Sequence, residues 1–192
     1  MKKTILFTLL AIVLMGCASN DFEENSVYEI PTHLNGVEIN GVRWATRNLD
    51  LSTPSGFADN PECFGMYFRF VKGYDNCPDG WRMPTREELE ALIGFGGVFT
   101  YRNGVKGRLF GVMPNQIFLP LAGFFYNIQG NESVQSAGIS SGYMSGTYTR
   151  SASGGWYIAY RKVTGRVHPD GYISRILLGG SGSISIRCVA ID

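Results

Sequence analysis

The side chains best suited to catalysis or metal binding are few in this sequence. The chain has two histidines, His33 and His168, and four cysteines. Neither the His-x-x-x-His nor the Cys-x-x-Cys spacing of zinc sites occurs. The segment Gly142–Gly146 lacks the spacing of a serine nucleophile elbow. We therefore expect no catalytic residue, no metal site and no enzyme, although a carboxylate pair of the glycosidase type stays open, because such residues meet only in three dimensions.

The stretch from Gly142 to Arg166 is richest in residues that form binding surfaces. Tyrosine, tryptophan and arginine dominate binding hot spots, and aromatic faces also stack on sugar rings. Glycine and serine between them leave loops adaptable. The strand expected over Trp156–Val163 can present only one of its two faces outward, and we expect Trp44, Trp81 and Trp156 to be structural. The candidate ligand contacts are Tyr143, Tyr148, Arg150, Tyr157 and Arg161.

The N-terminal residues have the pattern of a lipoprotein leader. Lys2 and Lys3 precede an apolar run, Ile5–Met15, that is too short to span a bilayer. The run ends in Leu14–Cys17 (LMGC), which resembles the lipobox of bacterial lipoproteins. The resemblance implies cleavage of a signal peptide, residues 1–16, and lipid on Cys17, with several acyl chains for stable anchoring. The alternative is an ordinary secretory leader with a chance cysteine.

Residues 17–32 are expected to form a flexible tether between the anchor and the domain. The residues after Cys17 are polar and acidic, as in a solvated linker. They also resemble the surface-export signal of Bacteroidetes lipoproteins. This resemblance implies an outer-membrane lipoprotein of the cell envelope that is displayed on the cell surface.

Composition predicts one globular domain over residues 33–192. Of the chain, 44% is hydrophobic and only 17% is charged, which excludes a disordered protein. The formal charge of +1 comes from dispersed basic residues, so we expect no nucleic-acid partner. The 25 glycines and the 13% aromatic content favour short strands, tight turns and long loops.

Local patterns predict a hairpin, one helix and several strands. Asn40-Gly41 between two alternating runs indicates a hairpin over residues 37–45. Thr85 and Glu88 form a capping box that starts a helix, with Leu89, Leu92 and Ile93 buried and Gly94 as its end. Strands are expected over 64–71, 105–110, 116–121, 156–163, 172–178 and 183–189, and loops over 124–141 and 140–155.

Several blocks resemble the Fibrobacter succinogenes major paralogous domain family. They are, in chain order, Gly41–Leu49 (GVRWATRNL), Gly65–Phe68 (GMYF), Cys77–Leu89 (CPDGWRMPTREEL), Asn103–Gly111 (NGVKGRLFG), Ile117–Gly123 (IFLPLAG) and Ser185–Val189 (SIRCV). The match covers nearly all of residues 34–191. It implies an α+β fold of the C-type-lectin type, related to the formylglycine-generating enzyme, with short strands, long loops and one helix near 85–93.

The family resemblance also implies a disulfide between Cys77 and Cys188. Export would allow it, since disulfides persist in oxidising compartments. Cys63 would then be free and buried, whereas the competing pair joins Cys63 to Cys77. Calcium has no support, because the ligand motifs of C-type lectins are absent and Asp75-Asn76 and Asp79-Gly80 are better explained as turns. We expect no cofactor.

These observations favour a lipid-anchored binding module for a glycan or a protein. The alternatives are a structural or assembly subunit of a surface adhesin complex and an enzyme of the sulfatase-modifying fold type. An exposed aromatic cluster within residues 142–166 would favour the binding module. A large apolar patch or an open strand edge would favour the assembly subunit, and a deep polar pocket would favour the enzyme.

Overall fold

The computed structural model describes residues 36–148, 154–163, 166–167, 172–177 and 182–191. Within these ranges the chain is mostly β-structure with a single helix, α1 (Arg86–Phe95), which confirms the α+β expectation. The strands are β1 (Val37–Ile39), β2 (Val42–Trp44), β3 (Trp81–Arg82), β4 (Gly97–Arg102), β5 (Val105–Val112), β6 (Asn115–Pro120), β7 (Phe124–Ile128), β8 (Asn131–Gln135), β9 (Ser140–Tyr148), β10 (Gly154–Val163), β11 (Arg166–Val167), β12 (Tyr172–Leu177), β13 (Gly182–Ser183) and β14 (Val189–Ala190).

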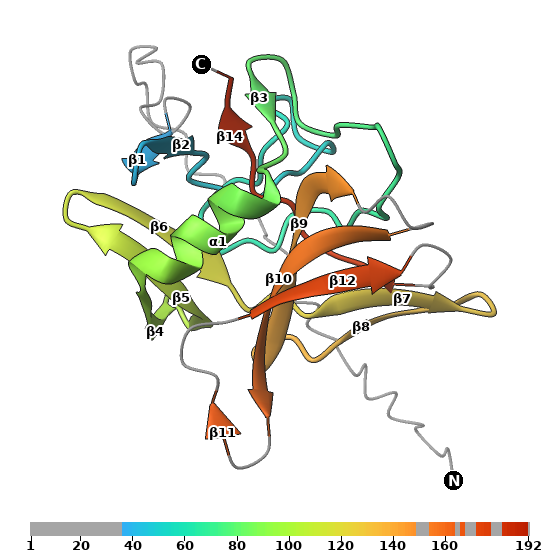
Figure 1. The fold of residues 1–192 in the computed structure, drawn as a ribbon. Helices are drawn as coiled ribbons and strands as arrows, with labels where there is room; N and C mark the ends of the chain where they lie inside the picture. The colour runs from blue at the N-terminus through green and yellow to red at the C-terminus, as the bar shows by residue number, and fades with distance from the viewer. Residues whose placement is uncertain (1–35, 149–153, 164–165, 168–171, 178–181, 192) are drawn as a thin grey trace, which may run out of the picture.

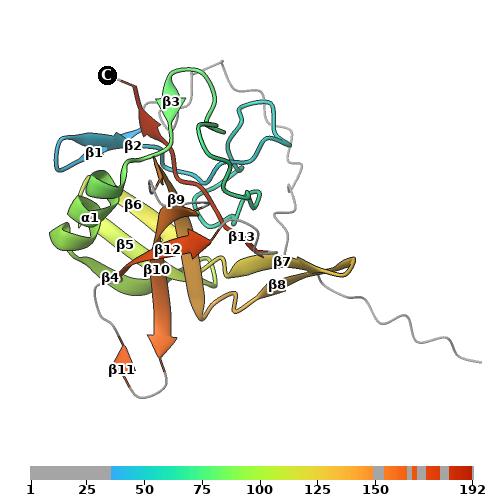
Figure 2. The same cartoon turned by 45° about the vertical axis from the view of Figure 1, so that its right-hand side comes forward.

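The strands form four small sheets (Figure 1). Their strand orders are β1-β2-β14-β3, β4-β5-β6, β13-β7-β8 and β11-β10-β12. In the last sheet β9 also pairs with β10. The helix α1 contacts β5 as well as β9, β10 and β12. It therefore covers parts of two sheets, as Figure 2 also shows.

The first sheet joins the two ends of the described chain. The predicted hairpin is confirmed, with Asn40 at φ 52° and Gly41 at φ 74° between β1 and β2. The last strand, β14, pairs Val189 with Trp44 of β2. This antiparallel pairing closes the domain, because it fixes the C-terminal segment beside the first hairpin (Figure 1).

The helix begins where the sequence predicts it and ends slightly later. The Thr85 hydroxyl accepts a hydrogen bond from the Glu88 amide, and the Glu88 carboxylate accepts one from the Thr85 amide, so the capping box is complete. Leu89 and Leu92 are buried. The predicted end at Gly94 is wrong, because the cap is Gly96, whose φ of 81° suits glycine.

The sheet β4-β5-β6, called the middle sheet below, supplies much of the core. The strands β5 and β6 confirm two predicted strands: β5 is two residues longer than predicted, and β6 begins and ends one residue earlier. The strand β4 was not predicted. Phe110, Ile117 and Leu119 pack with Leu89 and Leu92 of α1 in one buried cluster. A second cluster holds Phe57, Phe68, Phe70, Met83, Met144, Ile184 and Ile186 beside the disulfide.

Three segments differ from the expected elements. The stretch Phe64–Val71 is not a strand and makes only an isolated bridge from Phe68 to Ile184. Residues 183–189 form only two short strands, β13 and β14. The loops expected from residue 124 to residue 155 are largely strands, β7, β8 and β9, because β7 and β8 pair across the turn at Gln129-Gly130 and β9 pairs with β10. The strands expected near 156–163 and 172–178 are confirmed as β10 and β12.

Candidate binding surface

The middle of the domain contains a buried arginine whose side chain is held by uncharged acceptors. Arg187 is fully buried. Its guanidinium donates to Asn48 Oδ1 from Nε at 3.0 Å and from Nη2 at 2.7 Å. It also donates to the carbonyl oxygens of Ala45, at 3.1 Å, and Phe118, at 3.0 Å. Burial lowers the pKa of Arg187 to about 10, with Tyr143 acting in the opposite direction.

Asn48 extends this network to the later segment at Phe64 and to Tyr143. Its amide nitrogen donates to the Phe64 carbonyl at 3.0 Å and lies 3.4 Å from the Tyr143 hydroxyl. Tyr143 in turn donates to the Pro120 carbonyl at 2.8 Å. The network joins the loop after β2, strand β9, the end of β6 and the segment before β14, so its role is to hold the scaffold together.

Tyr143, a predicted ligand contact, is therefore a core residue. Only 1% of it is exposed, and burial raises the pKa of its hydroxyl to about 12. The expectation that it faces a ligand is not met, because its side chain belongs to the buried cluster that includes Phe110 and Leu121, and its hydroxyl donates to the Pro120 carbonyl. For Tyr148, Tyr157 and Arg161 the structure gives the backbone, in β9 and β10, and their side chains lie outside its description. Arg150 lies outside the described residues altogether.

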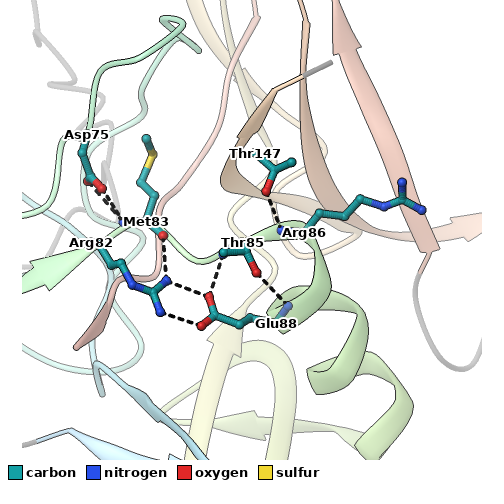
Figure 3. A network of polar contacts seen from close by, with 7 residues as sticks. All are labelled: Asp75, Arg82, Met83, Thr85, Arg86, Glu88 and Thr147. Carbon is teal, nitrogen blue, oxygen red and sulfur yellow. Dashed lines mark hydrogen bonds and ion pairs between the residues drawn. The ribbon is translucent and has the colours of Figure 1, made fainter. Parts of the chain in front are cut away.

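A second polar network fixes the start of α1 (Figure 3). Arg82 forms an ion pair with Glu88 through two hydrogen bonds, at 2.8 and 2.7 Å. These hydrogen bonds are the main reason that the pKa of Glu88 is lowered. Asp75 accepts from the amides of Met83 and Cys77, and Thr147 accepts from the amide of Arg86. The acidic residues near this helix thus serve its cap and the adjacent loop.

The Asp75 loop leads directly into the predicted disulfide. Cys77 and Cys188 are bonded, with their Cα atoms 6.1 Å apart, so this pairing is confirmed. The prediction that Cys63 is free is wrong, because Cys63, although buried as expected, is disulfide-bonded. Among the tryptophans, Trp44 is buried and Trp81 packs edge-on against Phe57, in line with structural roles. The Trp156 side chain lies outside the description.

Exposed aromatic residues occur at positions that were not predicted as contacts. Tyr101, at the end of β4, is 66% exposed and lies opposite Lys106 of β5, whose ammonium is 6.0 Å from the ring centroid. Tyr74, in the turn that follows Val71, is 60% exposed. The alternation of β4 could have indicated Tyr101, but that strand was not recognised from the sequence. A tyrosine beside a cation can stack on a sugar ring or anchor a protein contact.

The hairpin of β7 and β8 presents a different kind of recognition group. In the described sheet β13-β7-β8, β8 is the last strand, and all five of its residues are exposed. On the inner strand Phe125 stacks on Tyr67, with ring centroids 5.9 Å apart. The hairpin extends from the body of the domain in both views (Figures 1 and 2). A strand edge of this kind can pair with another extended chain.

The described residues include no group of three or more His, Cys, Asp or Glu side chains that could hold a metal ion. No helix in the described ranges is long and apolar enough to cross a membrane. Comparison with protein-family models, with curated proteins and with solved structures finds no match for this chain.

Proposed function

We propose that the chain is a lipid-anchored protein of the bacterial cell envelope whose domain binds a glycan or a protein at the cell surface. The proposed domain, residues 33–192, belongs to the Fibrobacter succinogenes major paralogous family and has its C-type-lectin-like fold. The leader and lipobox pattern of residues 1–17 support the anchor. The disulfide between Cys77 and Cys188 supports export, since such bonds are stable in oxidising compartments.

The observation that carries the binding function is the exposed ring of Tyr101 beside the half-buried Lys106. Many aromatic side chains of the described residues are buried in the core, whereas the ring of Tyr101 is exposed to solvent next to the Lys106 ammonium. Lectins and protein-binding surfaces both use such rings, because a large rigid face is bound at little entropic cost. We include Tyr148, Arg150, Tyr157 and Arg161 in the proposed surface as sequence-based candidates.

The binding function is tested by screening the lipidated protein, extracted in detergent, on a glycan array with calcium and then with a chelator. A glycan signal that falls at least about tenfold in Tyr101→Ala supports a lectin-like role. Arg43→Ala, on the exposed position of β2, serves as the matched surface control. A signal that Tyr101→Ala, Tyr148→Ala and Tyr157→Ala all leave intact would exclude this surface.

The anchor is tested by metabolic labelling with palmitate. We expect label on the wild type and none on Cys17→Ala. Because a thioether uses the Cys17 sulfur, a lipidated Cys17 cannot form a disulfide, and peptide mapping of the bonded Cys63 tests the anchor independently. A peptide that links Cys63 to Cys17 in the mature protein would contradict lipidation. Protease digestion of intact cells then tests surface display. If the domain is cut only after the cells are lysed, it is not displayed on the surface.

A second candidate function, an assembly subunit of a surface complex, is favoured by the open edge of β8. This edge offers backbone donors and acceptors to an extended partner strand, as in β-strand addition. Crosslinking from β8 in cell envelopes distinguishes this candidate from glycan binding by Tyr101, because the two surfaces lie on different sheets.

A further inference from the structure

The open edge of β8 has a defined set of outward backbone groups. β7 and β8 are joined by Gln129 and Gly130, both with positive φ, at 54° and 85°, as in the two-residue turns of tight hairpins. In such a turn the carbonyl before the loop accepts from the amide after it, so the amide of Asn131 points toward β7. Because backbone direction alternates along a strand, the N–H and C=O groups of Glu132 and Val134 point outward.

The side chains of β8 leave this edge accessible. β8 contains no proline, and its register with β7 is continuous over all five residues. Its one charge, on Glu132, accepts a hydrogen bond from the Asn127 amide at 3.0 Å, across the hairpin. The carboxylate is thus held toward β7, and β8 contains no lysine, proline or bulge of the kind that protects a strand edge.

We propose that β8 pairs with β8 of a second copy of this chain, antiparallel and about a two-fold axis at Ser133. In this register Glu132 lies opposite Val134 of the second copy, and each such pair exchanges both backbone hydrogen bonds. The two sheets then continue into one another in the order β13-β7-β8-β8-β7-β13.

The occupant is a second copy because the strand is complementary to itself. In this register Glu132 lies opposite Val134 rather than opposite another acid, and like charges directly opposite one another would be unfavourable. Asn131 faces Gln135, so amide side chains meet amide side chains. Val134, which is 45% exposed in the single chain, becomes covered on one side by the stem of Glu132. The projection of the hairpin from the body lets two domains approach edge to edge (Figure 2).

Pairing through five residues buries less than the roughly 1,000 Å² of a stable interface, so the dimer is weak in free solution. Attachment to one membrane raises the local concentration of copies and favours pairing. This step rests on the proposed lipid anchor and deepens the assembly function, with a homotypic partner.

The test is cysteine crosslinking of the full-length protein in its own cell envelope. At a non-hydrogen-bonded antiparallel pair the Cα atoms lie about 4.5 Å apart, within reach of a disulfide. Ser133→Cys should therefore give a disulfide-linked dimer on mild oxidation. Asn131→Cys is the matched control, because the two copies of residue 131 lie roughly 13 Å apart along the strand and should give at least about tenfold less dimer. Coexpressed Asn131→Cys and Gln135→Cys should crosslink to each other.

A backbone variant completes the test. Val134→Pro removes an outward N–H without removing a hydrogen bond to β7, so it should abolish the Ser133→Cys dimer while the chain stays folded. Equal crosslinking of Ser133→Cys and Asn131→Cys would show random collision and overturn the proposal. Crosslinking of Ser133→Cys to a different envelope protein would also overturn it. Palmitate labelling of the same samples separates the two ideas: labelled protein without dimer refutes the pairing alone, whereas unlabelled protein refutes the anchor.

Discussion

The buried guanidinium of Arg187 offers the sharpest test of how this scaffold is held together. In the variant Arg187→Met the side chain keeps much of its volume but loses every donor. Asn48 Oδ1 and the carbonyl oxygens of Ala45 and Phe118 then remain in the interior without the hydrogen bonds that Arg187 donates. We expect the domain to fold with clearly reduced stability.

The magnitude follows from two opposing effects. Each buried acceptor left without its donor costs about 1–3 kcal/mol, so the three acceptors together cost roughly 3–9 kcal/mol. Removing the cation relieves the cost of burying charge, which the drop of its pKa from 12.5 to about 10 places at about 3 kcal/mol. The net loss in the free energy of unfolding is about 3 kcal/mol, near the middle of a range from zero to about 6 kcal/mol.

The assay is urea unfolding followed by tryptophan fluorescence. Arg43→Met, on the exposed position of β2, is the control and should change stability by less than about 0.5 kcal/mol. The double variant Asn48→Ala with Arg187→Met should lose less stability than the two single variants lose together. The difference should be about 0.5–3 kcal/mol, because the two residues share hydrogen bonds. An Arg187→Met protein as stable as the wild type would refute the view that this network holds the core.

Further predictions concern the disulfide, the helix cap and the middle sheet. Replacing Cys77 and Cys188 by alanine opens a bridge across a sequence separation of 111 and should cost about 5 kcal/mol, read from urea midpoints; a loss under about 1 kcal/mol would contradict it. The hydrogen bonds from Arg82 lower the pKa of Glu88 below its usual 4.5. The stabilisation of the folded state by ionised Glu88 is therefore present above pH 4.5 and is lost as the pH falls through the folded-state pKa. Glu88→Gln should therefore be less stable at neutral pH and lose less stability on acidification, and parallel pH curves would exclude this effect. Gly107→Ala should cost about 1–3 kcal/mol, because its Cβ would overlap the Phe118 ring and the Leu119 carbonyl oxygen. A neutral result in thermal unfolding would show that both can move aside.

Local signals in the sequence were sufficient for several elements. The Asn40-Gly41 turn and the capping box of Thr85 and Glu88 depend only on residues within a few positions of one another. The pairing of Cys77 with Cys188 came from the family resemblance and is present in the structure. The family assignment, the anchor and the ligand surface stay predictions.

Two of the errors concern contacts between residues that are distant in the sequence. The alternation of aromatic residues over Phe64–Val71 resembles a strand, yet this segment finds only one bridging partner, at Ile184. Tyr143 has the residue type of a ligand contact, but β9 turns it toward the Pro120 carbonyl. No local pattern distinguishes the two faces of such a strand when glycine and serine surround it.

The sequence alone therefore determined the class of the domain, its single described helix and its first hairpin. Each of these follows from residue composition or from hydrogen bonds that span a few residues. Only the tertiary structure decided that Arg187 would reach Asn48, that Tyr143 would be buried and that β8 would form an open edge. These features depend on which strands become neighbours, and that choice is made by the packing of the whole core rather than by any one segment.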